Sequence, residues 1–145
     1  MSTIYRFEDL PVWQQSRTLC NRVFRMIEQS QSFKSDFKFR DQLRASAGSV
    51  MDNVAEGFER SSRLEFVNFL GIAKGSTGEV RSQVYRAIDN KYIDHIDGIA
   101  IIDEYERLAK EIAGFISYLN KSTVKGQKFK DRTGRFLISN HKSQI

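Results

Sequence analysis

The chain has 145 residues, of which 40% are hydrophobic and 28% charged, a composition typical of a single globular domain with a sizeable core. A single cysteine, Cys20, excludes an intrachain disulfide and any multi-cysteine metal site. The net charge of +5 is unevenly distributed, because residues 1–119 carry 16 Lys and Arg against 17 Asp and Glu, whereas residues 120–145 carry seven against one. The basic character therefore belongs to the C-terminal tail, which favours weak attraction to polyanions through the tail over a broad nucleic-acid-binding surface.

The sequence contains no apolar segment long enough to span a membrane, and its first residues lack the continuous apolar run of a signal peptide. One unpaired cysteine also suits a reducing compartment. We therefore expect a cytoplasmic protein without a membrane partner.

Hydrophobic residues recur with a helical period in four segments, and the first of these spans roughly residues 9–29. Asp9 is its candidate N-cap, and Pro11 suits the first turn. Trp13 flanks the apolar stripe of this helix and is predicted either to pack in the core or to anchor a second subunit, as is Phe24. The polar run over residues 29–35 then breaks the period.

The second helix is expected to begin at a cap formed by Ser35 or Asp36, and to end at Gly57, a natural left-handed C-terminal residue. Ser46 and Asn53 fall on its inward side, where each polar group needs a hydrogen-bonding partner. An inward asparagine can fix the register between helices. Binding of a small ligand is the alternative.

Ser62 and Glu65 form a capping box that begins the third helix, which is expected to run to about Lys91. Residues 94–98 form another short joint, and an apolar stripe after it predicts the fourth helix. Short joints make sequential helices antiparallel neighbours, so the sequence predicts an all-α, up-down-up-down antiparallel four-helix bundle over residues 1–121.

The third helix carries a strip of small residues on the side opposite its apolar stripe. At about 100° per residue, this strip consists of Gly71, Gly75, Gly78 and Ser82. Each glycine inside a helix costs roughly 1 kcal/mol relative to alanine, so a strip without a packing partner is a net loss. We predict that the strip is an oligomer interface along which a helix of a second copy packs closely. A merely local packing reason is the alternative.

Residues 122–145 form a basic tail that is expected to be a flexible arm that orders on contact. Its basic residues alternate with Phe129 and Phe136, a combination that suits phosphate contacts and base stacking on single-stranded RNA or DNA. A solubilising extension has the same composition. The candidate nucleic-acid-binding residues of the tail are Lys125, Lys128, Lys130, Arg132, Arg135 and Lys142.

Arg44, Arg60 and Lys74 are weaker candidates for phosphate contacts within the predicted bundle. The favoured alternative for each is a surface ion pair, because exposed pairs are common and carry little information. The candidate acidic partners are Asp41, Glu56 and Glu79.

No catalytic residue, metal ligand or cofactor is expected. A dinuclear carboxylate centre in a helical bundle needs paired Glu-x-x-His motifs, and the sequence has none. The two histidines, His95 and His141, lie in a joint and in the tail without an accompanying cluster of carboxylates or cysteines. Cys20 has no activating neighbour and is predicted to be buried and inert. We therefore predict that the protein is not an enzyme.

Several motifs in one order carry a family resemblance: Phe7-Glu-Asp-Leu10, Gln42-Leu43-Arg44, Asn53-Val-Ala-Glu-Gly57 and Phe69-Leu-Gly-Ile-Ala-Lys-Gly-Ser76. Over roughly residues 5–120 the sequence resembles the four-helix-bundle family named for proteins encoded in intervening sequences of bacterial 23S ribosomal RNA genes. The resemblance implies a homopentameric ring and a distant kinship to the accessory proteins of diversity-generating retroelements, which assist a reverse transcriptase and bind nucleic acid.

Two positions depart from the family pattern, because Met51 stands where the family usually has proline and Ala45 where it often has a second basic residue. The tail lies beyond the usual family limit, so no family role transfers to it. We expect a non-enzymatic homo-oligomer that acts as an RNA-associated, nucleic-acid-binding accessory protein. The alternatives are a structural or protein-interaction module with a protein partner, and an accessory subunit of a reverse transcriptase.

Overall fold

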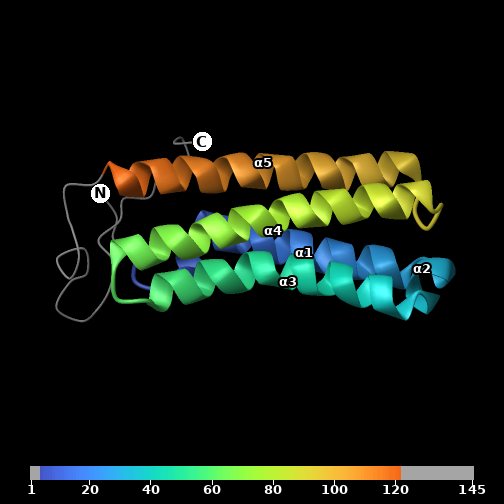
Figure 1. Cartoon of the computed structure of the whole chain (residues 1–145), viewed down its shortest axis with the longest axis horizontal. Coiled ribbons are helices and arrows are strands. Elements are labelled where there is room, and N and C mark those ends of the chain that lie inside the picture. The colour runs from blue at the N-terminus through green and yellow to red at the C-terminus, as the bar shows by residue number, and fades with distance from the viewer. Residues whose placement is uncertain (1–3, 122–145) are drawn as a thin grey trace.

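The computed structural model describes residues 4–121, which form four long helices packed side by side (Figure 1). The chain reverses direction between consecutive long helices, so that sequential neighbours are antiparallel. The predicted all-α fold is confirmed, and the described residues contain no strand. The long helices are α1 (Pro11–Glu28), α3 (Phe37–Glu59), α4 (Arg63–Asp89) and α5 (His95–Asn120).

Two short elements were not predicted: a 3-10 helix, η1 (Phe7–Asp9), and the five-residue helix α2 (Gln31–Ser35). The polar run that breaks the period of α1 is thus not wholly irregular. The Ser30 side chain caps α2 by accepting a hydrogen bond from the backbone N–H of Phe33 at 3.3 Å. Phe33 is fully buried and stacks on Phe39 with 5.2 Å between ring centroids. Burial of the Phe33 ring therefore stabilises α2, which is too short to show a helical period of apolar residues in the sequence.

The starts of the helices confirm some of the predicted caps and correct others. Asp36 caps α3 by accepting from the backbone N–H of Phe39, and Ser62 caps α4 by accepting from that of Glu65. Asp9 is not a cap, because it lies within η1 and α1 begins after Leu10, whose side chain accepts no hydrogen bond. Likewise, α5 begins at His95, inside the joint expected at residues 94–98.

Gly57 does not end its helix, and this prediction is wrong. Helix α3 continues to Glu59, and Gly57 is buried within it. A Cβ atom at Gly57 would lie 2.6 Å from Cβ of Phe69 and 3.1 Å from Cδ1 of Phe66. The glycine therefore allows α3 and α4 to approach closely, which is a packing requirement and not a left-handed backbone conformation.

The interior of the bundle is an apolar core to which all four long helices contribute. Near the α3–α4 turn, the buried Phe66 ring makes edge-to-face contacts with the rings of Phe58 and Phe115. Trp13 is also nearly buried, with its ring 5.1 Å from that of Phe7. Of the two roles considered for Trp13, the structure therefore favours core packing.

A polar seam joins α3 to α4 beside this core. The Ser49 and Ser76 hydroxyls hydrogen-bond to each other across the two helices at 2.9 Å. The Asn53 amide donates to the carbonyl and the hydroxyl of Ser49, at 2.8 and 2.9 Å. Ser46, by contrast, donates to the carbonyl of Gln42 in its own helix. Asn53 thus acts through Ser49 on the contact with α4, which fits a role in helix register.

The end of α5 lies beside the start of α4. A guanidinium nitrogen of Arg63 donates to the carbonyl oxygen of Leu119 at 3.3 Å. The last residues of α5 therefore lie at the end of the bundle that holds the α3–α4 turn (Figure 1). Over residues 4–121, no helix is long and apolar enough to cross a membrane.

Candidate interaction surfaces

The strip of small residues on α4 is open in the single chain. Gly71 and Gly75 are exposed, and a Cβ atom built at either would meet no described heavy atom within 4 Å. At Gly78 the nearest atom would be a guanidinium nitrogen of Arg81 at 3.7 Å, and Ser82 is exposed. No packing within residues 4–121 therefore explains Gly71 and Gly75, whereas Gly57 is explained by its neighbours on α4.

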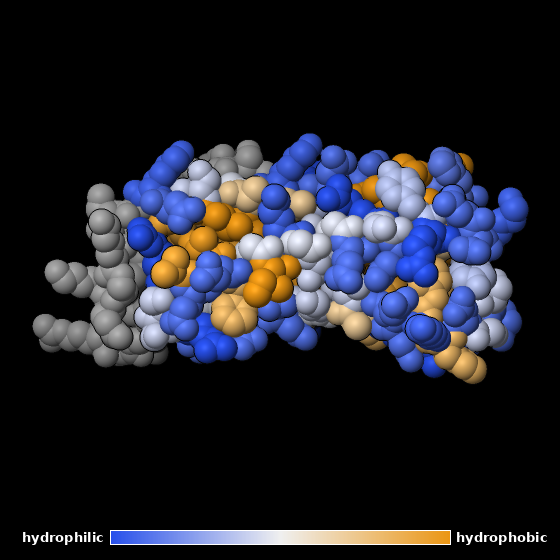
Figure 2. All heavy atoms as spheres, in the orientation of Figure 1, coloured by the Kyte–Doolittle hydropathy of each residue, from blue (hydrophilic) through white to orange (hydrophobic). Residues whose placement is uncertain are grey.

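Large apolar side chains are exposed near the strip. Leu64 is 69% exposed and Ile72 52% exposed, and Phe69 between them is half-buried. We call Leu64, Phe69 and Ile72 the apolar patch. Figure 2 shows hydrophobic residues gathered over this part of α4, near the end where α3 turns into α4, with a pale band of small residues beside them. Contiguous exposed apolar groups of this kind are typical of interaction surfaces.

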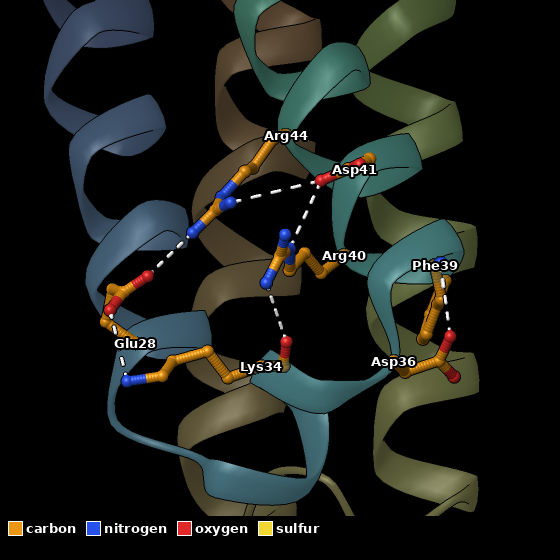
Figure 3. Close-up of polar contacts among 7 residues, drawn as sticks. All are labelled: Glu28, Lys34, Asp36, Phe39, Arg40, Asp41 and Arg44. Atoms are coloured by element: carbon orange, nitrogen blue, oxygen red, sulfur yellow. Dashed lines mark hydrogen bonds and ion pairs between the residues drawn. The ribbon is translucent and has the colours of Figure 1, made fainter.

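Arg44 is held by neighbours on two helices (Figure 3). Its guanidinium lies 2.7 Å from a carboxylate oxygen of Glu28 on α1 and 3.9 Å from one of Asp41 on α3. It also covers the Phe24 ring, with 5.3 Å to the centroid. The predicted pair with Asp41 is confirmed, but the shorter contact to Glu28 was not anticipated. Arg44 therefore joins α1 to α3, which favours the ion-pair reading over a free phosphate ligand.

The same network fastens the short helix α2 to α3 (Figure 3). Arg40 donates to the carbonyl oxygen of Lys34 at 2.8 Å and pairs with Asp41 at 3.2 Å. The Lys34 ammonium lies 3.6 Å from Glu28. Opposite charges alternate in this cluster, so it offers no uniformly positive surface.

Arg60 and Lys74 differ in their surroundings. Arg60 pairs with Glu56 at 2.9 Å, as predicted, and with Glu65 at 4.0 Å, and its guanidinium covers the Phe69 ring at 5.0 Å. Lys74 is exposed and makes no ion pair with a described residue, so the candidate partner Glu79 is not used. Of the three basic candidates in the bundle, Lys74 alone lacks such a pair within residues 4–121.

These three residues do not converge. Arg44 lies at the seam of α1 and α3, Arg60 at the α3–α4 turn and Lys74 near the middle of α4. The candidate residues Lys125, Lys128, Lys130, Arg132, Arg135 and Lys142 all lie outside the described residues. The structure thus places the origin of the tail but none of its side chains.

Among residues 4–121, the buried and half-buried titratable groups form no recognisable reactive centre. Burial, and to a smaller extent the charge of Asp52, raises the pKa of the Cys20 thiol, which keeps it in the unreactive protonated form. Burial is also the main cause of the raised pKa of Glu111. His95 is exposed at the start of α5. Within the described part of the chain, no group of three or more His, Cys, Asp and Glu residues could hold a metal ion.

Three hollows on the surface of residues 4–121 are open to solvent. One of about 270 Å³ lies between α1 and α5 and is lined by Arg22, Arg25 and Asp97 among others. Asn53 does not line this hollow, or those near Tyr92 and Trp13. None of these three hollows therefore supports the small-ligand alternative for Asn53, whereas its hydrogen bonds with Ser49 support the role in helix register.

The described residues define an antiparallel helical bundle protein with an apolar core. Its candidate interaction features lie on the surface, namely the open strip of small residues and the neighbouring apolar patch. The chain belongs to the family of 23S rRNA-intervening sequence proteins, whose family model matches residues 8–114. Among solved structures, it is similar to a protein of unknown function from the S23 ribosomal protein family of Bacteroides thetaiotaomicron, with a TM-score of 0.68.

That likeness concerns the fold alone, since the two sequences are 22% identical. It covers 72% of this chain and 97% of the other chain. None of the curated proteins compared with this sequence matches it. The family match ends at residue 114, so residues 122–145 lie outside it.

Proposed function

We propose that this protein is a non-enzymatic, homo-oligomeric accessory protein that binds RNA or another single-stranded nucleic acid through its C-terminal tails. The observation that carries the proposal is the position of the last residues of α5. Because Leu119 lies beside Arg63, at the start of α4, the tail begins at one end of the bundle. Copies related by a rotation axis along the bundle would present all their tails at that same end.

The open strip on α4 supports the assembly. Helices can pack closely along Gly71, Gly75, Gly78 and Ser82 because these residues carry little or no side chain. The ring of five copies that the family resemblance implies would gather five tails of charge +6, or about +30 in total. Weak individual contacts to phosphates then add up, provided that one strand spans the tails.

The charge distribution supports the tail as the binding element. Residues 1–119 sum to −1, and Arg44 and Arg60 are committed to carboxylates. Lysines and arginines of the tail have one acidic residue, Asp131, among them. Binding that depends on release of counterions from phosphates weakens steeply with salt.

The test is retention of a labelled, unstructured RNA on filters across a salt series. The full chain is compared with a chain that ends at Lys121, and with a full-length control in which the six basic tail candidates are replaced by glutamine. We expect the full chain to show retention that falls with salt, and both variants to lose it. Absence of salt-sensitive retention of the full chain at low salt would rule out the proposal.

The apolar patch favours a second candidate, a protein-interaction module, of which an accessory subunit of a reverse transcriptase is one form. Leu64 and Ile72 expose apolar surface that a partner protein could cover. Recovery of one stoichiometric protein partner after nuclease treatment, lost on Ile72→Asp, would support this candidate. Loss of the partner on nuclease treatment would instead favour nucleic-acid binding.

A further inference from the structure

The apolar patch lies next to the point where the tail begins. Leu64 follows Arg63, whose guanidinium donates to the Leu119 carbonyl two residues before Lys121. Phe69 is on the side of α4 that faces α3, since its Cβ is the closest atom to the space beside Gly57. The patch therefore occupies the first three turns of α4, and Gly75, Gly78 and Ser82 continue along the next turns.

The tail carries an apolar segment that nucleic-acid binding does not require. Phe136-Leu-Ile138 is the only run of three large apolar residues after α5. Fourteen residues separate Lys121 from Phe136, and this connection can extend to about 50 Å. The patch from Leu64 to Ile72 spans about 12 Å along α4. The segment can thus reach any part of the patch. The entropic cost of closing this loop is modest, because that cost grows only slowly with loop length.

We propose that the Phe136–Ile138 segment docks on the apolar patch of the same chain. The segment and the patch would remove each other's apolar side chains from water. The charge near the patch suits a segment of a basic tail. At the α3–α4 turn three glutamates, Glu56, Glu59 and Glu65, stand against two arginines, Arg60 and Arg63. Docking would hold the basic stretch from Lys125 to Arg135 as a loop at this end of the bundle. It concerns the free chain and does not depend on RNA binding.

The test is photo-crosslinking in the full chain. Ile72 is replaced by the photoreactive residue benzoylphenylalanine, and in a control variant Ile96 is replaced instead. Ile96 is a matched control because it is 75% exposed and lies in the first turn of α5, at the opposite end of the bundle. We expect position 72 to form a crosslink within one chain to the peptide that contains residues 136–138, with a yield independent of protein concentration, and position 96 to form none.

A second set of variants tests the apolar character of the contact. A triple variant carries Phe136→Ser, Leu137→Ser and Ile138→Ser in the tail. It should lower the crosslinking yield from position 72 about tenfold. Crosslinks from position 72 to residues 136–138 of a second copy, the absence of any crosslink to residues 136–138 of its own chain, or an undiminished yield in the triple variant would each overturn the proposal. These results are independent of the RNA retention assay, so either hypothesis can fail alone.

Discussion

Gly57 and Gly48 lie on the same helix but have opposite surroundings. A methyl group at Gly57 would be 2.6 Å from Cβ of Phe69, whereas one at Gly48 would meet nothing within 4 Å. Because Phe69 Cβ is fixed to the α4 backbone, Gly57→Ala must push the two helices apart, and we expect a loss of about 2 kcal/mol of unfolding free energy. Gly48→Ala is the control and should gain up to about 1 kcal/mol from helix propensity. Denaturant unfolding of both variants measures the difference, and equal midpoints would contradict the prediction.

Tyr105 is fully buried, and its hydroxyl has no hydrogen-bond partner among residues 4–121. Burial is the main cause of the raised pKa of this phenol. Removing an unsatisfied hydroxyl relieves its desolvation cost, so Tyr105→Phe should leave stability at pH 7 unchanged or raise it by about 1 kcal/mol. Thermal unfolding at fixed protein concentration checks this. A clear loss of stability would show that the hydroxyl has a partner that the described contacts do not include.

At the scale of elements, the sequence predicts what local chemistry decides. Apolar residues at a helical period locate all four long helices. Ser62 marks the start of α4 because its side chain accepts a hydrogen bond from the backbone N–H of Glu65, only three residues along the chain. Helix α2 was not predicted, because the stability of its five residues depends on packing of Phe33 against Phe39, which the local sequence does not reveal. Gly57 is misread because a C-terminal glycine and a close-packing glycine look the same in one sequence.

The candidate surfaces are predictable only in part for the same reason. The strip on α4 follows from its own spacing, and the structure leaves Gly71 and Gly75 open as that spacing suggested. The contact of Arg44 with Glu28 joins residues 16 positions apart on different helices, so it depends on how α1 packs on α3. The apolar patch was missed, although Leu64 and Ile72 fall outside the apolar stripe of α4, and that position was the available signal.

Tyr92 connects the α4–α5 turn to the start of α3, and we expect this contact to be sensitive to alkaline pH. Its hydroxyl donates to a carboxylate oxygen of Asp36 at 2.7 Å, and this hydrogen bond is the main cause of the raised pKa of Tyr92. A raised pKa in the folded state means that the stabilisation is complete below the usual tyrosine pKa of 10.0 and is lost as the pH rises through the folded value. Unfolding free energy should therefore fall as the pH rises above about 10.

Two variants isolate this contact. Tyr92→Phe cannot ionise and should show a shallower decline in stability above that pH, at the cost of a lower stability at neutral pH. Asp36→Asn keeps an N-cap for α3 but removes the charge that opposes ionisation of Tyr92, so it too should flatten the decline. Unfolding measured between pH 8 and about pH 11 tests both, and an unchanged profile in Tyr92→Phe would assign the alkaline loss to other groups.

At the scale of the whole molecule, the basic tail begins at one end of the bundle, whereas large apolar side chains are exposed at both ends, Leu64 at one end and Phe37 and Ile96 at the other. The tail begins beside the α3–α4 turn, and the apolar patch occupies the first turns of α4 there. The opposite end is closed by α2, by the aromatic contacts of Phe33 with Phe39 and Tyr92, and by ion pairs of mixed sign. A cyclic assembly would repeat this polarity in every copy, so that its two ends would differ in charge.

A substitution at Gly75 can test assembly separately from folding. Because nothing in the described chain approaches its Cβ position within 4 Å, Gly75→Leu should keep the helical circular dichroism of the parent and its core, with a gain of up to about 1 kcal/mol in helix propensity. In the proposed oligomer the same leucine would hold the neighbouring helix away from α4 and abolish close packing. Sedimentation of Gly75→Leu as a monomer, with Gly75→Ala intermediate because one methyl group intrudes less, is the expected result. Sedimentation of the leucine variant at the size of the parent would mean that the strip is not where the copies meet, and the small residues of α4 would then need another explanation.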